Sequence, residues 1–400
     1  MGKPGTVPSW LPAYSREQLA LLEPGNEPVP VPALRTYPDP ALFRYSHDRV
    51  LSDPRDAMRT TKLVADIVSE SPRTYTVTEA TPRIANDVAQ YGPPPAREPD
   101  IWLVAKRDPA GRLQLVSAEV SKEAKEAYDE GHEALKKGRA AEAVKALRGA
   151  VRLAPSAPPL HLELGRALVA NKQLDAAEAE FREVIHLDPT LSFGHEELAS
   201  LLHQRGDVYG ARTSIAHALA YHPNEEGALD LASKIAPTPG ERPVPFSIFL
   251  EVDPMGVVRV ASGPTVGARM YAGCRAVMRY EPELREALFG VGPNDPYFLS
   301  VAEEMFCIES AIGAFVAERA VARDEGRSAP EDTQTSALTG LAHTEGLLGF
   351  VMYEILGRHR PEHARTAPAA VHRATVRYVQ QHILNYDPGP NPTNYVASAR

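Results

Sequence analysis

The chain has 400 residues, 43% hydrophobic and 24% charged, which is enough for two or three globular domains with cores of their own. A formal net charge of -9 and a pI near 5.8 argue against a protein that binds nucleic acid through a broad basic surface. Two cysteines, Cys274 and Cys307, are too few for a disulfide framework, and their apolar helical contexts predict buried thiols with a structural role.

The N-terminus predicts a cytoplasmic protein. Met1 to Trp10 lacks the charged start and apolar stretch of a signal peptide, and no apolar run of about 18 residues occurs in the chain. The proline-rich leader from Pro4 to Pro32 also resembles the tether of a cell-envelope lipoprotein whose signal has been removed. That alternative stays open.

Residues 1–98 hold many of the 37 prolines, so we expect few long regular elements there. We predict an extended strap over the folded domains, or a linker, and the aromatic residues of the region favour the strap. One helix is expected from Pro54 to Ser69, with Asp53 as its cap. Its apolar side would carry Ala57, Leu63, Val64 and Ile67.

Two segments predict β-hairpins. Ile101 to Ala118 and Phe246 to Ser262 each run from an apolar strand through an Asp-Pro-x-Gly turn to a second apolar strand. A lone two-stranded hairpin is marginally stable in water, so we expect the two hairpins either to pair with each other or to dock on helices.

Three prolines, Pro155, Pro189 and Pro223, lie 34 residues apart and close three similar segments, which begin at Ala124, Pro158 and Ser192. Small and apolar residues recur at the same places of each segment. Place 8 is small, place 20 is alanine, and place 24 is a large apolar residue: Gly131, Gly165 and Ala199; Ala143, Ala177 and Ala211; Leu147, Phe181 and Ile215. The prolines at place 32 end the second helix of each segment because proline cannot donate into the helical ladder.

This pattern resembles the tetratricopeptide repeat over about 124–225. The resemblance implies three helix-turn-helix units stacked into an α-solenoid. The aromatic residue expected at place 4 is absent, since Ala127, His161 and His195 stand there. Asn224 to Ala236 predicts a further helix that covers the open face of the last repeat.

The resemblance also implies a concave groove lined by places 2, 5, 9 and 12 of each first helix. The residues predicted to bind a partner there are Tyr128, His132, Leu135, Leu162, Arg166, Val169, Phe193, Glu196 and His203. Relatives that grip a C-terminal carboxylate use lysines and asparagines at these places, and this chain lacks such a set, which argues against a receptor for chaperone tails. Occupation of the groove by the protein's own strap or C-terminal helices is the alternative.

From Pro264 onward we expect helices near 265–279, 295–323, 334–358 and 367–385, which suit a four-helix bundle of no family that we recognise. Glu309, Glu345 and His382 interrupt its predicted apolar stripes and are candidates for a metal site or an acid-base pair. The structural alternative pairs them with Arg275, Arg279 or Arg377, or places them at the edge of the bundle in water.

The sequence contains no phosphate-binding glycine loop, Gly-x-Ser-x-Gly elbow, His-Glu-x-x-His or Cys-x-x-Cys motif, so we assign no catalytic residue and no cofactor. The predicted fold is mainly α: a solenoid of three repeats, a C-terminal helical bundle and two short hairpins. The predicted domains are 1–98, 99–120 (hairpin), 121–238 (repeats and cap) and 239–400.

The function that we expect is a protein-interaction adaptor that holds a peptide or helix of a partner protein in its groove, without nucleic acid or a transmembrane segment. The alternative is an enzyme or metal-binding protein whose C-terminal domain acts on a protein substrate that the repeats recruit. A third interpretation is structural, with the repeats bridging domains of one assembly.

Overall fold

A computed structural model describes residues 54–79, 101–109, 113–289, 297 and 299–387 of the chain. The proline-rich leader and the predicted cap at Asp53 lie outside the described residues. The chain divides into two compact units: Met1–Pro94 with Pro243–His359, and Pro95–Arg242 with Arg360–Arg400. In the described ranges no helix is both long and apolar enough to cross a membrane.

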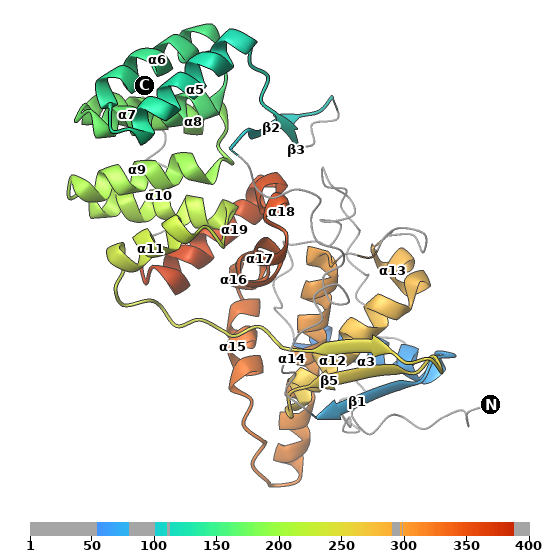
Figure 1. Cartoon of the computed structure of the whole chain (residues 1–400). Coiled ribbons are helices and arrows are strands. Elements are labelled where there is room, and N and C mark those ends of the chain that lie inside the picture. The colour runs from blue at the N-terminus through green and yellow to red at the C-terminus, as the bar shows by residue number, and fades with distance from the viewer. Residues whose placement is uncertain (1–53, 80–100, 110–112, 290–296, 298, 388–400) are drawn as a thin grey trace. The chain divides into compact units, whose positions relative to one another are not determined.

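The second unit contains the three predicted repeats, which stack as pairs of antiparallel helices (Figure 1). The helices are α5 (Lys122–Lys136) and α6 (Ala140–Leu153), α7 (Pro158–Ala170) and α8 (Leu174–Leu187), and α9 (Ser192–Gln204) and α10 (Val208–Tyr221). The predicted covering helix is α11 (Glu226–Ile235), which packs on α9 and α10. The helical solenoid is therefore confirmed.

The small residues at place 8 let the two helices of a repeat approach closely. A Cβ atom on Gly165 would lie 2.4 Å from the Phe181 ring, and one on Gly131 would lie 2.5 Å from the Leu147 side chain. Phe181 and Leu147 are fully buried. In the first two repeats, place 8 of the first helix therefore lies directly against place 24 of the second.

The turn inside each repeat needs a left-handed residue at place 15. In the first and third repeats this residue is glycine: Gly138 and Gly206 have φ of 72° and 81°. The second repeat has Lys172 there, with φ of 60°. A lysine is thus held in a conformation that favours glycine.

The histidines at place 4 have a structural explanation. The Nε2 atoms of His161 and His195 donate to the carbonyl oxygens of Pro155 and Pro189, at 2.8 and 2.9 Å. Each bond ties a first helix to the proline that ended the previous repeat. Histidine therefore replaces the expected aromatic with a ring that packs and also satisfies a carbonyl group.

Both predicted hairpins form, and they belong to different sheets. Strands β2 (Leu103–Arg107) and β3 (Leu113–Ser117) make an antiparallel pair in the second unit. Strands β4 (Phe249–Val252) and β5 (Val258–Ser262) pair in the first unit, where β1 (Tyr75–Glu79) joins β5 in parallel. Of the two expected arrangements, pairing between the hairpins does not occur, and docking on helices is the one found.

Asp188 joins the β2–β3 hairpin to the repeats. This fully buried carboxylate accepts a hydrogen bond from the Ala105 backbone N–H at 2.9 Å. It also forms an ion pair with Arg365 at 3.1 Å. Arg365 also donates to the carbonyl oxygen of Leu103 at 2.8 Å. One charged pair therefore holds three distant segments together.

The last helices do not complete the predicted four-helix bundle. Helices α18 (Pro361–Thr366), α19 (Ala369–Tyr378) and η2 (Val379–Ile383) pack on α10 of the third repeat (Figure 1). The His372 ring stacks on Tyr221 at 3.8 Å, and its Nε2 lies 3.1 Å from His217 Nδ1. Burial lowers the pKa of His217 to about 3 and that of His372 well below its ordinary value, so this contact is uncharged at neutral pH.

The first unit packs α3 (Pro54–Glu70), α12 (Val266–Tyr280) and α14 (Val301–Asp324) beside the β1-β5-β4 sheet (Figure 1). The predicted N-terminal helix is thus α3, and it belongs to the C-terminal core. A Cβ on Gly313 of α14 would lie 2.1 Å from Thr61 Oγ1, which donates to the Ser310 carbonyl. The absence of a side chain at Gly313 permits this crossing.

The remaining helices of the first unit are α13 (Pro282–Phe289), α15 (Thr333–Ala342), α16 (Gly346–Phe350), η1 (Val351–Leu356) and α17 (Gly357–His359). The single helix predicted over 334–358 is therefore interrupted between Ala342 and Gly346. The helix predicted from 295 begins at Val301, because Ser300 caps it and makes a capping box with Glu303.

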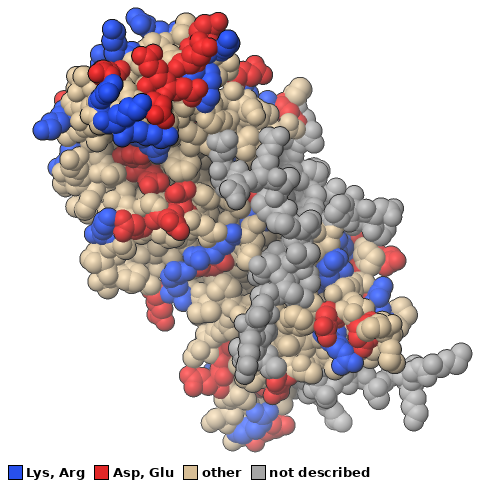
Figure 2. All heavy atoms as spheres, in the orientation of Figure 1, with Lys and Arg blue, Asp and Glu red and all other residues tan. Residues whose placement is uncertain are grey.

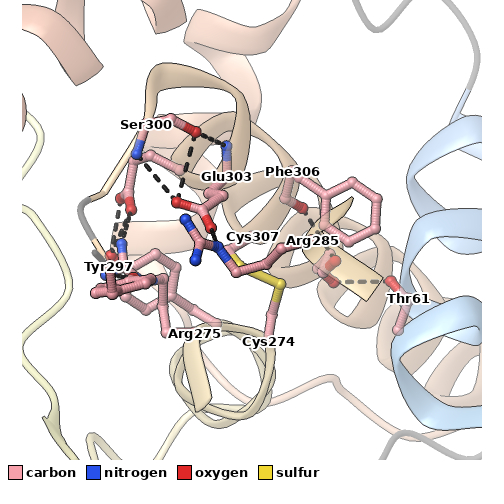
Figure 3. The surroundings of a disulfide bond; sticks show 12 residues. Thr61, Cys274, Arg275, Arg285, Tyr297, Ser300, Glu303, Phe306 and Cys307 are labelled. Atoms are coloured by element: carbon pink, nitrogen blue, oxygen red, sulfur yellow. Dashed lines mark hydrogen bonds and ion pairs between the residues drawn. A yellow bond between two sulfur atoms is a disulfide. The ribbon is translucent and has the colours of Figure 1, made fainter. Parts of the chain in front are cut away.

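The two cysteines form a disulfide between α12 and α14 (Figure 3). Cys274 and Cys307 are fully buried, as predicted, but they are not thiols. Beside them Arg275 donates to Glu304 at 2.6 Å, and both side chains are fully buried. The sequence did not indicate the disulfide, because only the packing of α12 on α14 brings Cys274 and Cys307 to a Cα separation of 5.3 Å.

Candidate functional site

The first helices α5, α7 and α9 carry all nine residues predicted to bind a partner. We call the surface made by places 2, 5, 9 and 12 of these helices the first-helix face. Seven of the nine residues are at least partly exposed, namely His132, Leu135, Arg166, Val169, Phe193, Glu196 and His203. The other two, Tyr128 and Leu162, are buried.

At the first repeat, the chain itself contacts the first-helix face. The Trp102 ring packs edge-on against Tyr128, with their centroids 5.0 Å apart, and Lys125 Nζ lies 4.0 Å from the Trp102 ring centre. Tyr128 in turn stacks on His132. The hairpin therefore takes the contact that we had assigned to a partner at Tyr128.

Polar side-chain contacts join successive repeats along the same face. His132 Nδ1 lies 2.6 Å from Glu163 Oε1, and Arg166 Nε donates to Glu197 Oε1 at 2.6 Å. Arg166 also lies 3.5 Å from Glu163, which is almost fully buried. In both cases place 9 of one repeat contacts place 6 of the next.

Glu163 and Glu197 were not among the site residues predicted from the sequence. Their signal was available, since both are glutamates at place 6 and each follows a basic side chain at place 9 of the preceding repeat. Burial lowers the pKa of Arg166, but the charges of Glu197 and Glu163 outweigh this effect and leave the pKa raised. Arg166 is therefore a structural link as well as an accessible charge.

Glu196 is the most electrostatically perturbed acid of the first-helix face. Burial, together with the negative charges of Glu225 and Glu197, raises its pKa to about 7. Its Oε2 atom is buried and accepts no hydrogen bond from any described residue. A cationic group of a ligand would offset the repulsion from Glu225 and Glu197 and could donate a hydrogen bond to this carboxylate.

The three candidate metal ligands lie in different surroundings. Glu309 is buried in α14, whereas Glu345 is exposed at the start of α16. His382 belongs to the other unit, where its Nδ1 lies 2.7 Å from the Glu241 carbonyl oxygen and its ring stacks on Tyr378. Within the described ranges no group of three His, Cys, Asp or Glu side chains is placed to hold a metal ion.

Two buried arginines of the first unit contact Tyr297, which is labelled with them in Figure 3. Arg275 donates to its hydroxyl at 3.1 Å, and the Arg285 guanidinium lies 4.7 Å from its ring centre. Arg285 is paired with Glu303. Arg275 thus has the structural pairing that we considered for the candidate acids, but its partner is Glu304.

Acidic and basic side chains are intermixed over the repeats in the view of Figure 2, which agrees with the absence of a one-signed basic surface in the sequence. The first-helix face itself has Arg166 and Glu196 as charged side chains and Leu135, Val169 and Phe193 as partly exposed apolar ones. Such a surface is suited to a peptide or helix.

Residues 128–192 match the family model of the tetratricopeptide repeat. Among solved structures, the first repeat domain of Spaghetti (RPAP3) bound to an HSP90 peptide is 19% identical, with a TM-score of 0.28, over 29% of this chain and 91% of that one. The repeat domain of Arabidopsis OM64 is 15% identical, with a TM-score of 0.28, over 28% and 94%. The TPR2B domain of yeast Sti1 in a pHsp70 complex is 23% identical, with a TM-score of 0.27, over 29% and 94%. No curated protein matches the sequence.

Proposed function

We propose that this chain, which contains tetratricopeptide repeats, is an adaptor that binds a peptide or helix of a partner protein on its first-helix face. The observation that carries the proposal is a set of partly exposed apolar residues on the three first helices, together with one charged side chain of each sign. Leu135, Val169 and Phe193 are the apolar residues, and Arg166 and Glu196 are the charged ones.

Each part of this surface has a physical role in the proposed binding. Apolar anchors supply affinity by leaving water, and the charges fix the direction of the bound segment. Arg166 lies 6.0 Å from the Phe193 ring centre, so a carboxylate and an apolar side chain of one partner segment would be held close together. Glu196 would accept a lysine or arginine of the partner.

Some of the matched solved domains are bound to chaperone peptides according to their descriptions. We do not extend that ligand to this chain. Lys125, the lysine at place 2, is packed over Trp102 and Tyr128, and the face has no further lysine or asparagine at the predicted lining places. The proposed partner segment is therefore internal and of mixed polarity.

A photo-crosslinking residue tests the proposal. Benzoylphenylalanine at Phe193 or Leu135 should capture the same partner in the native host, at a peptide that carries apolar and charged side chains. The control position is Val208 on α10, which is 43% exposed and lies outside the first-helix face. Equal capture at Val208, or no capture at Phe193 and Leu135, would contradict the assignment.

The compartment is part of the proposal. A structural disulfide such as Cys274–Cys307 persists in oxidising compartments and is rare in the cytosol. We therefore favour the envelope alternative over the cytoplasmic one. Alkylation of unfolded protein taken directly from host cells should label neither cysteine without a reductant and both after reduction. Labelling of the cysteines without a reductant would favour the cytoplasmic alternative instead.

A further inference from the structure

A pocket lies between the second helices of the first two repeats, away from the first-helix face. It encloses about 510 Å³ between α6 and α8. Val144, Val151 and Leu164 give it an apolar floor, and Lys145, Arg148 and Arg152 line it from α6. We call it the α6–α8 pocket.

The three cations share one side of α6, because they follow one another at helical spacing, three and four residues apart. All three are exposed. In the described part of the chain none of them is paired with a carboxylate, and Arg148 has only a 3.4 Å hydrogen bond to Gln173. Three cations without a carboxylate partner among the described residues therefore line the α6 side of an apolar floor.

The one acid that lines the pocket does not offset them. Glu180 Oε2 lies 2.7 Å from His161 Nδ1. Burial lowers the pKa of His161, but Glu180 and the Pro155 carbonyl outweigh burial and leave that pKa raised. The carboxylate of Glu180 is thus bonded to His161, a neighbour inside the repeats. Positive side chains still outnumber negative ones in the lining of the pocket.

The next repeat provides an internal comparison. An equivalent pocket of about 590 Å³ lies between α8 and α10. The places of Lys145, Arg148 and Arg152 are taken there by Ala179, Arg182 and His186. Arg182 donates to Glu178 at 2.6 Å, so the second pocket has the same framework without the unpaired cations.

We propose that the α6–α8 pocket binds an acidic segment of a protein, with carboxylates on Lys145, Arg148 and Arg152 and an apolar side chain on the floor. Charge complementarity identifies the occupant. A nucleic-acid backbone would leave the apolar floor unfilled, and the net charge of -9 opposes a polyanion beyond the pocket. The inference goes beyond the proposed function, because the first-helix face is made by other helices.

The probe is a synthetic, fluorescein-labelled helical peptide with glutamates three and four residues apart on one side and leucines beside them. Its affinity for the whole chain is measured by anisotropy at low and at physiological salt. We expect binding that weakens with salt, and about tenfold weaker binding by the triple variant Lys145→Gln, Arg148→Gln, Arg152→Gln. The same peptide with glutamine in place of glutamate should bind about as weakly to the unchanged protein.

The matched control removes three charges elsewhere on the first repeat, by Lys122→Gln, Lys136→Gln and Lys137→Gln. These lysines are exposed and paired with acids on α5, so binding should change by less than about twofold. Thermal unfolding followed by circular dichroism checks that both triple variants are folded.

Four results would overturn the inference: no binding to the unchanged protein, equal loss in both triple variants, loss on Arg166→Gln in place of the pocket variant, or tighter binding of a single-stranded oligonucleotide to the same pocket. The third result would place the peptide on the first-helix face. It would leave the proposed function standing, so the two proposals fail separately.

Discussion

At the scale of the residue, the repeats contain one backbone position that the sequence does not suit. Lys172 holds the left-handed conformation that glycine supplies in the other two repeats. An L-residue in this conformation costs about 1–2 kcal/mol, which glycine would avoid. Part of that benefit is lost because glycine has more conformational freedom in the unfolded chain.

Lys172→Gly should therefore raise the free energy of unfolding of the repeats by about 0.5–1 kcal/mol. Urea unfolding measured by circular dichroism checks the change. Lys137→Gly is the matched control, since Lys137 also lies at a helix end but has φ of -84°, and it should be neutral or destabilising. Equal effects of the two substitutions would show that helix-end composition, and not the φ angle, is responsible.

Glu196 predicts a pH dependence of stability. Its pKa of about 7 in the folded protein lies above the ordinary value of 4.5, so between these values the folded state binds more protons than the unfolded state. Stability should then fall as the pH rises from about 4.5 to 7, and the full cost should remain above 7.

Glu196→Gln keeps the shape of the protonated acid and should remove this fall. The variant should be more stable than the unchanged protein near pH 8 and similar to it near pH 5, as measured by urea unfolding at both values. Glu226→Gln on the exposed start of α11 is the control. A variant that loses stability at the higher pH would mean that ionised Glu196 is favourably paired.

At the scale of the element, the C-terminal helices depend on one buried ion pair. Asp188 is fully buried and Arg365 nearly so, and Arg365 links α18 to the backbone of β2 and to the turn before α9. Removal of one partner leaves the other charge buried and costs about 3–5 kcal/mol.

Arg365→Ala should therefore destabilise the second unit by about 3 kcal/mol and speed hydrogen exchange in α18, α19 and the β2–β3 hairpin. Exchange followed by mass spectrometry locates the effect. Arg373→Ala, at an exposed arginine of α19, should leave it unchanged. The double variant Arg365→Met, Asp188→Asn should recover part of the lost stability, because neither charge of the ion pair remains buried. Unchanged hydrogen exchange in Arg365→Ala would contradict the role of this ion pair in holding the C-terminal helices.

At the scale of the molecule, the disulfide should affect one unit only. Cys274 and Cys307 are separated by 33 positions in the sequence, and closing a loop of this size stabilises by about 3–4 kcal/mol in the chain-entropy account. Both cysteines belong to the first unit.

The variant Cys274→Ala, Cys307→Ala should lower the unfolding transition of the first unit and leave that of the repeats in place. Trp102 reports on the second unit through its contact with Tyr128, so its fluorescence in a Trp10→Phe background isolates the repeats, while calorimetry shows both transitions. A parallel shift of Trp102 fluorescence would mean that the two units unfold together.

Much of the second unit could be predicted from the sequence, because its determinants are local and repeated. Places 8, 20, 24 and 32 recur every 34 residues; places 8 and 24 meet inside a helix pair, and the proline at place 32 ends its second helix. For the same reason, the residues predicted to bind a partner lie on the first helices, as the repeat pattern implied. Their accessibility was not predictable, since Tyr128 is covered by Trp102 from a separate hairpin.

The sequence by itself determined the solenoid, its covering helix and both hairpins, because periodicity and turn chemistry act between near neighbours. Only the tertiary structure decided that Cys274 meets Cys307, that α3 joins the C-terminal core, and that the last helices leave the expected bundle for α10. These contacts join segments far apart in the chain, as between Arg365 and Leu103, 262 residues away. They depend on shape and charge complementarity between surfaces that exist only after the local elements have formed.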